Sequence, residues 1–485
     1  MSDTSLKEKT AKGLFWGGFS NGIQQLLNLG FGIVLARLLD ASDYGMVGML
    51  TIFSAIAAAL QEGGFISALT NRKETLHKDY NAVFWFSLTM GGGLYVLFFL
   101  AAPWIADFYG APELTAGARV LFLWFLFICT GTVHNAILIK RLMMKEKTRA
   151  DLTAFIVSCV VAVTMAFCGM AYWSLIVQMV VQGAVSTALR WYYSPWRPSL
   201  RFPKAPLRRM FPFSIKLLVT GLFNVVNDNI FTLILGIRYS KSQAGYYSQG
   251  RKWSYMAYSS LWGMVSNVSQ SVLAQVADTP GRQRDVFHKL AGFMAFVVCP
   301  CMLGLAFVAP ELTTITVTDK WADSVPYMQL FCLWGIIAPL NNLCTNTLLS
   351  RGKSGVYMYG TVALDVVQLA VIYLSAPLGI YQMVVNYIVV NLCWFFVWFF
   401  FIRRCIPVSL VRLLLHDILP YAALTLAAIA VVHFAVSPLE NVYLRFVCKI
   451  ILVAMLYAGT LYVLRSTLLR ETLDYLKRMI HKQKT

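Results

Sequence analysis

Apolar runs of about 20 residues recur along this chain, each long enough to cross the hydrocarbon core of a bilayer as a helix. With 58% hydrophobic and only 13% charged residues among 485, the composition lies far from that of a soluble globular domain. A segment inside a bilayer must satisfy its own backbone hydrogen bonds, so runs of this kind predict helices. The sequence therefore predicts an all-α, polytopic membrane protein.

The apolar runs define about fourteen expected transmembrane helices. Their ranges are 13–37, 44–70, 81–103, 116–139, 150–170, 172–192, 210–237, 244–276, 286–308, 324–349, 355–375, 380–402, 418–436 and 442–464. With these spans, the amino terminus, the even-to-odd connections and the tail, together with the span ends that adjoin them, hold 31 of the 41 Lys and Arg residues. That asymmetry follows the positive-inside rule, so both termini are expected in the cytoplasm. The formal charge of +19 thus reflects topology, and nucleic acid is not an expected partner.

An internal repeat divides the chain. "ARLLDASDYGMV" (36–47) follows the first span and "GIRYSKSQAGYY" (236–247) follows the seventh, so that Gly45 aligns with Gly245. Six spans return the chain to its starting side, so the two copies are parallel and predict a pseudo-two-fold axis with a cleft between two lobes. The expected organisation is a six-helix lobe (1–192), a basic cytoplasmic linker (193–209), a second six-helix lobe (210–402), helices 13 and 14 (403–464) and a basic amphipathic tail (465–485).

Polar residues form stripes on two equivalent helices. On the seventh span, the positions Lys216, Thr220, Asn224, Asn227 and Asp228 fall within an arc of about 120° at 100° per residue. A charge near the bilayer centre costs roughly 2.5–3.5 kcal/mol, so this stripe should face protein or water. Interhelical hydrogen bonding and a cavity wall both explain such a stripe, and five polar residues on one face favour the cavity wall.

The first span carries a matching stripe of Asn21, Gln25 and Asn28. Because the first and seventh spans occupy equivalent places in the two repeats, we expect their polar faces to meet across the cleft and to contact the substrate.

The eighth span offers a surface of cations and aromatic rings. Arg251, Lys252, Tyr255, Tyr258 and Trp262 follow one another along it. Aromatic rings stack on the C–H faces of sugars, and arginine can grip phosphate in a bidentate fork. Interfacial anchoring explains aromatic residues near a membrane end, and snorkelling of the cations to the outer surface is an equally good explanation of Arg251 and Lys252.

Three acidic residues lie within or near the expected spans. Glu62 and Asp228 are candidates for coupling or gating, as is Asp365, and either H⁺ or Na⁺ would be the coupled ion. A structural ion pair with an arginine explains Glu62 equally well. His134 in the fourth span is more typical of a packing hydrogen bond than of a proton relay. The ten cysteines include no C-x-x-C pair, and we expect no metal site and no cofactor.

Four segments together resemble the polysaccharide transporter family, the flippases of lipid-linked oligosaccharides in the superfamily that also holds multidrug and toxin exporters. These segments are "ARLLDASDYGMVGM" (36–49), "QEGGFISALTNRKE" (61–74), "NDNIFTLILG" (227–236) and "AGYYSQGRKW" (244–253). Glu62 stands where the family usually has an aspartate. The resemblance implies a 6+6+2 helix architecture with a V-shaped lumen in the bacterial cytoplasmic membrane.

The resemblance also implies a substrate and partners. The substrate would be an undecaprenyl-diphosphate-linked oligosaccharide, moved from the inner to the outer leaflet for O-antigen, capsule or exopolysaccharide synthesis. Arg251 and Lys252 would attract the diphosphate. Further partners would be membrane lipids and, through the basic tail, the polysaccharide synthesis machinery.

Two other functions fit parts of the sequence. A multidrug or metabolite exporter of the same fold would use Glu62 or Asp228 to bind cationic compounds. A membrane glycan polymerase or ligase would need a large outer loop with catalytic side chains, and the longest outer connections (104–115 and 309–323) are short. The sequence therefore favours a transporter over an enzyme.

Overall fold

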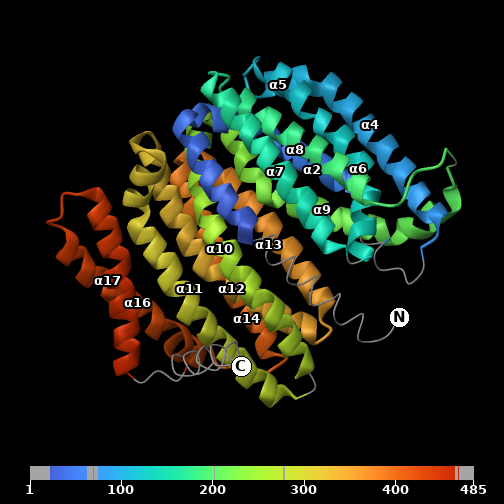
Figure 1. Ribbon diagram of the computed structural model, residues 1–485. Coiled ribbons are helices and arrows are strands. Elements are labelled where there is room, and N and C mark those ends of the chain that lie inside the picture. The colour runs from blue at the N-terminus through green and yellow to red at the C-terminus, as the bar shows by residue number, and fades with distance from the viewer. Residues whose placement is uncertain are drawn as a thin grey trace, which may run out of the picture. The chain divides into compact units, whose positions relative to one another are not determined.

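The computed structural model describes residues 22–62, 69, 75–141, 143–200, 202–276, 279–464 and 468. Within these ranges, the structure does not describe some side chains. They belong to residues 61–62, 204, 209, 211–221, 224, 227–228, 260, 262–268, 270–271, 274 and 354. The regular elements of this described part are all helical (Figure 1). Its residues divide into two compact units, 1–248 and 249–485.

The first unit begins with a helix at Gly22–Leu38. The helices that follow are α2 (Ala41–Glu62), α4 (His77–Phe108), α5 (Leu114–Leu121), α6 (Leu123–Lys140), α7 (Met144–Phe167), α8 (Trp173–Tyr193), α9 (Lys204–Arg238) and the first turns of α10 (Lys241–Gln275). Its main core holds apolar side chains of α2, α4, α5, α6, α7 and α8, with Leu50, Leu114 and Phe125 fully buried. Apolar residues at helical spacing thus create the contacts that bind this unit together.

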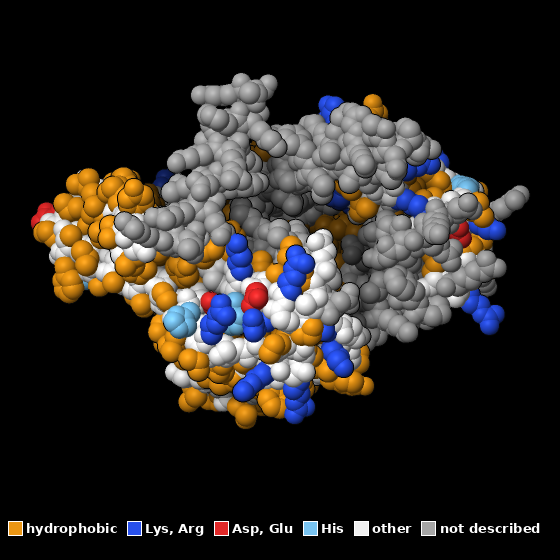
Figure 2. All heavy atoms as spheres, turned by 90° about the horizontal axis from the view of Figure 1, so that it is seen from below, with side chains coloured by type: hydrophobic (Ala, Val, Ile, Leu, Met, Phe, Trp, Pro, Cys, Tyr) orange, Lys and Arg blue, Asp and Glu red, His pale blue; other side chains and the backbone are white. Residues whose placement is uncertain are grey.

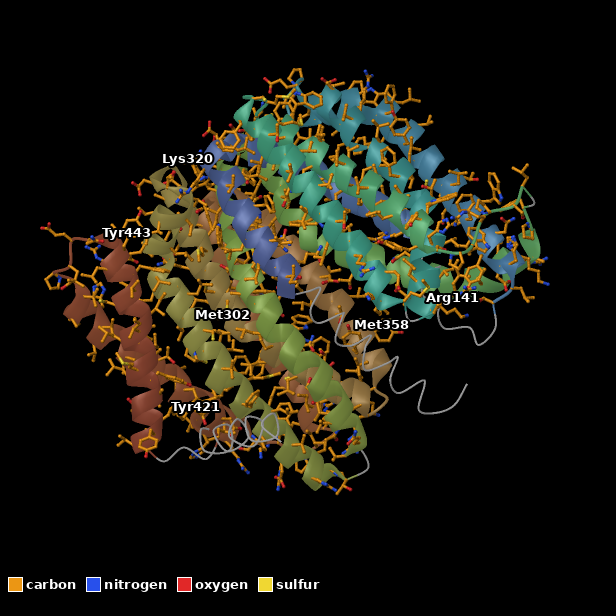
Figure 3. All side chains as sticks on the ribbon, in the orientation of Figure 1. Arg141, Met302, Lys320, Met358, Tyr421 and Tyr443 are labelled. Carbon is orange, nitrogen blue, oxygen red and sulfur yellow. The ribbon has the colours of Figure 1, made fainter. Side chains whose placement is uncertain are left out.

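The second unit contains the rest of α10 and the following elements. They are α11 (Pro280–Val317), η1 (Asp319–Ser324), α12 (Val325–Ser350), α13 (Ser354–Ser375), η2 (Ala376–Leu378), α14 (Ile380–Arg403), α15 (Leu410–Arg412), the π-helical segment η3 (Leu413–Ile418), α16 (Leu419–Val436) and α17 (Val442–Val463). The pair α16 and α17 lies against α11 (Figure 1). Lys320 and Tyr443 lie at one end of this unit and Tyr421 at the other (Figure 3).

Every expected span overlaps a helix of the described part. Ten helical stretches of the described part, one of them formed by α5 and α6 together, are long and apolar enough to cross a membrane. Two shorter stretches, Gly22–Leu38 and Asn229–Arg238 at the end of α9, are apolar as well. The range 116–139, expected as one helix, is divided into α5 and α6 at Phe122. The chain is therefore a multi-pass membrane protein, and the number fourteen stays a prediction.

The compact units do not follow the sequence repeats. The division falls after Ser248, inside α10, so that α9 packs with the first unit through α2 and α4. The two lobes expected at 1–192 and 210–402, which would move against each other during transport, stay a prediction.

Basic side chains gather at one end of the second unit (Figure 2). They come from the start of α11, the α12–α13 turn and the segment after α14: Arg282, Arg284, Lys289, Arg351, Lys353, Arg403, Arg404 and Arg412. The positive-inside rule predicts this distribution for a cytoplasmic end.

Candidate functional site

The aromatic and basic side chains of α10 differ in how far they are exposed. Tyr255 is 53% exposed, Lys252 is exposed and Arg251 is half-buried. Tyr258, one turn beyond Tyr255, is only 8% exposed. The two tyrosine rings are 6.1 Å apart, so an open aromatic position lies directly beside a buried one.

Tyr258 is a packing residue in this structure. Its ring meets Trp334 of α12 edge to face at 4.9 Å, in a cluster with Val298, Met302 and Cys332. Met302 is labelled on α11 in Figure 3. Nearby, Ser254 donates a hydrogen bond of 2.8 Å to the Met328 carbonyl, which fixes α10 to α12. Tyr255, Arg251 and Lys252 are therefore the expected binding positions that lie outside this core.

A buried amide network joins α12, α13 and α14 around Asn391. The Asn341 side chain donates to the Asn391 carbonyl at 3.2 Å, and the Gln368 side chain donates to Asn391 Oδ1 at 3.3 Å. Asn391 in turn donates to the Tyr387 carbonyl at 2.8 Å. Asn391 was not among the expected site residues, although an amide in the apolar run "IVVNLCWFF" is the signal that marks it.

This network contains acceptors without donors. Asn341 Oδ1 and Gln368 Oε1 are buried and have no hydrogen-bond partner among the described residues, and Gln368 is only 2% exposed. Asp365 is 6% exposed and precedes Gln368 by three residues, which places both on one face of α13. Carbonyl oxygens beside a carboxylate attract a cation or a hydrogen-bond donor.

The polar stripes of the first unit are described only in part. Gln25 and Asn28 are half-buried on the helix Gly22–Leu38. Asn229, which lies off the predicted stripe of α9, donates to the Val225 carbonyl at 2.8 Å. The remaining expected positions lie outside the described residues or side chains: Asn21, Glu62, Lys216, Asn224, Asn227, Asp228 and Trp262.

His134 of α6 is fully buried in an aromatic cage. Its ring centroid is 4.4 Å from that of Trp191 and 5.4 Å from that of Trp196. Neither ring nitrogen has a hydrogen-bond partner in the described part of the chain. The expected packing hydrogen bond of His134 is thus not among the described contacts, and the ring contacts fix its position instead. In the same described ranges, no three His, Cys, Asp or Glu side chains gather as a metal-ligand set.

Comparison with known proteins decides the family. A model of the family described as "Polysaccharide biosynthesis protein" matches residues 34–326, more than half of the chain. The chain belongs to this family. This match confirms the family resemblance that the sequence motifs predicted.

Individual relatives in this family cover most of the chain. The lipopolysaccharide biosynthesis protein WzxC of Escherichia coli (strain K12) is 25% identical over 351 residues, covering 72% of this chain and 71% of that protein. The teichuronic acid biosynthesis protein TuaB of Bacillus subtilis (strain 168) is 22% identical, covering 73% and 74%. The succinoglycan biosynthesis transport protein ExoT of Rhizobium meliloti (strain 1021) is 22% identical, covering 63% and 62%.

Solved structures confirm the fold of this family member. The lipid II flippase MurJ in an inward closed conformation superposes with a TM-score of 0.72 at 12% identity, covering 93% of this chain and 99% of that one. An inward-facing multidrug resistance MATE family transporter gives 0.63 at 16% identity, covering 79% and 94%. The predicted all-helical fold is therefore confirmed.

Proposed function

We propose that the protein is a flippase that moves an oligosaccharide linked to undecaprenyl diphosphate from the inner to the outer leaflet of the bacterial cytoplasmic membrane. The observation that carries this proposal is the family match over residues 34–326. The names of WzxC, TuaB and ExoT each refer to the synthesis of a different polysaccharide, and that of ExoT refers to transport. The shared task is therefore independent of the glycan, as expected of a carrier for lipid-linked intermediates.

The chemistry of the candidate residues agrees with such a substrate. A diphosphate needs cations, which Arg251 and Lys252 would supply with Lys216 of α9. A sugar is bound by aromatic rings that stack on its C–H faces and by amides that hydrogen-bond its hydroxyls. Tyr255 would supply the ring, and Gln25 and Asn28 the amides. Alternating access would then expose these groups first to the cytoplasm and afterwards to the outer leaflet.

Charge favours movement in the proposed direction. A cytoplasm-negative potential contributes roughly 2.3 kcal/mol per charge per 100 mV, so about two outward-moving diphosphate charges gain roughly 4–5 kcal/mol. Ion coupling would then reset the empty carrier. Asp365 is the described candidate for binding H⁺ or Na⁺, since it lies three residues before Gln368, whose side-chain oxygen is buried without a hydrogen-bond partner among the described residues. Glu62 and Asp228 keep the same predicted role.

Location and partners follow from this function. Both termini would lie in the cytoplasm, where the basic tail (465–485) would contact the inner leaflet or the polysaccharide synthesis machinery. The chain itself would be a transporter and not an enzyme.

Complementation of a surface-polysaccharide export mutant tests the proposal. The wild-type chain should restore glycan at the cell surface, whereas Arg251→Ala and Asp228→Ala should lower it at equal membrane expression. Lys320→Ala, in η1 outside the predicted binding stripes, is the control. If the chain restored drug resistance but no surface glycan, it would instead be a multidrug or metabolite exporter. The likeness in fold to a MATE family transporter is the observation behind this second candidate function.

A further inference from the structure

The connection that follows α8 is held against the first unit. The sequence "SPWRPS" (194–199) contains two prolines and was expected as part of a linker between lobes. In the structure the Ser199 N–H donates to Asn81 Oδ1 at 2.9 Å, and Trp85 Nε1 donates to the Ser199 carbonyl at 2.7 Å. Both bonds join this connection to α4 across more than 110 residues of sequence. We call residues 194–199 the strap.

Trp196 anchors the middle of the strap. Its Nε1 donates to His77 Nδ1 at 3.0 Å, and its ring lies 5.8 Å from Phe84 of α4 and 5.4 Å from His134 of α6. Since the indole N–H can only donate, His77 accepts at Nδ1. Aromatic pairs at these distances contribute beyond the area that they bury.

The same cluster holds the start of α9. Met210 is 2% exposed and packs with Tyr80, Phe84, Val133 and Ile137, and Leu207 packs beside them. Trp196 contacts this cluster too. Strap and first turns of α9 therefore share one set of partners on α4 and α6.

We propose that Trp196 is a positioning residue that, through the strap, fixes the cytoplasmic start of α9 to the first repeat. The first turns of α9 then keep their place relative to α4 and α6 during transport. Movement between the two repeats is confined to chain that lies beyond this anchored start. The consequence for transport rests on the proposed function, whereas the anchoring itself does not.

Hydrogen–deuterium exchange of the purified full-length protein tests the anchoring directly, without substrate. In the wild type, peptides containing Ser199 should exchange at least about tenfold more slowly than an unprotected chain. Trp196→Ala should raise exchange in the strap and the first turns of α9, and leave α7 unchanged. Trp104→Ala removes a tryptophan of α4 that is 74% exposed, and it should change neither region.

Two conservative variants separate positioning from general stability. Trp196→Phe keeps a ring in the cluster and should restore most of the protection lost in Trp196→Ala. Trp85→Phe keeps an aromatic ring on α4 but removes the indole N–H that bonds the Ser199 carbonyl, and should raise exchange mainly in the strap. Unprotected strap amides in the wild type would overturn the proposal. So would a Trp196→Ala variant whose exchange rose equally throughout the first unit.

Glycan export then reports on transport. In the complementation assay, Trp196→Ala should lower export at least threefold at equal expression, and Trp196→Phe should recover it. If exchange behaves as expected but the wild type exports no glycan, the anchoring stands and the proposed function fails. Full export by a Trp196→Ala variant with a freed strap would refute the positioning role.

Discussion

Gly45 of α2 and Gly245 of α10 each face the backbone at the start of the other's helix. A Cβ on Gly45 would lie 1.9 Å from the Lys241 carbonyl oxygen, and a Cβ on Gly245 would lie 1.8 Å from that of Ala41. The contacts are reciprocal and their partners are related by the 200-residue offset of the repeat. The two helices therefore cross as closely as backbones can, and only glycine fits at either position.

Replacing either glycine should separate the crossing. Gly45→Ala or Gly245→Ala forces the backbone to move, because the obstructing atoms are not flexible side chains. We expect a loss of about 1–3 kcal/mol of stability, measured as a lower melting temperature of the purified protein. The control is Gly48→Ala, whose Cβ would find ordinary contacts at 3.5 Å to Thr232 and 3.6 Å to Ser248. Equal melting temperatures for Gly45→Ala and Gly48→Ala would contradict the close crossing.

A buried ion pair should hold α17 to α11. Lys449 Nζ lies 2.7 Å from Glu311 Oε1, donates to the Phe307 carbonyl at 3.3 Å, and lies over the Phe307 ring at 4.2 Å. Lys449→Met would leave Glu311, only 6% exposed, as an unpaired buried charge, so we expect a loss of about 3–5 kcal/mol. Thermal unfolding of the purified protein measures this loss.

Two further variants check that burial is the cause. The double variant Lys449→Met with Glu311→Leu should recover much of the stability, because no lone charge remains. The exposed pair of Lys241 and Glu113, also at 2.7 Å, should contribute less than about 1 kcal/mol when Glu113→Gln breaks it. Similar losses for the two broken pairs would rule out this explanation.

The amide network should depend on Asn391. Asn391→Leu removes the acceptor of the Gln368 side chain and leaves that buried amide without it, at a cost of about 1–3 kcal/mol. We also expect lower glycan export, since Gln368 of this network lies three residues after Asp365, the candidate coupling group. Asn386→Leu on the same helix breaks a bond to the half-buried Gln382 and should cost less. Unchanged stability of Asn391→Leu would show that the network is not structural.

Asp365→Asn should separate coupling from packing. The amide keeps the size of the side chain and loses its charge, so export should fall and become insensitive to collapse of the H⁺ or Na⁺ gradient. Asp285→Asn, at an exposed position of α11, is the matched control. Export that retains its full gradient dependence in Asp365→Asn would assign coupling to Glu62 or Asp228.

His134→Phe should be tolerated. Both ring nitrogens of His134 are buried without a partner in the described chain, so an apolar ring of similar size removes a desolvation cost. We expect stability to stay equal or to rise by up to about 1 kcal/mol, with normal export, measured by thermal unfolding and complementation. Loss of export at normal stability would instead support a proton relay.

The sequence by itself determined the membrane-spanning helices, the repeat and the family. Length and hydrophobicity of a run are local properties, and they were sufficient because a lone segment in a bilayer has almost no alternative to the helix. The alignment of Gly45 with Gly245 was visible for the same reason, since a repeat preserves spacing along the chain.

Only the tertiary structure decided which faces meet. Tyr258 and Tyr255 are both tyrosines on one helix, yet one packs on Trp334 and the other is exposed. The strap carries prolines that predict a linker, but Trp85 and Asn81 hold it from more than 110 residues away. Asn391, Glu311 and Lys449 likewise gained their partners from other helices. Such contacts depend on the rotation and crossing of whole helices, which packing between distant segments fixes and local sequence does not.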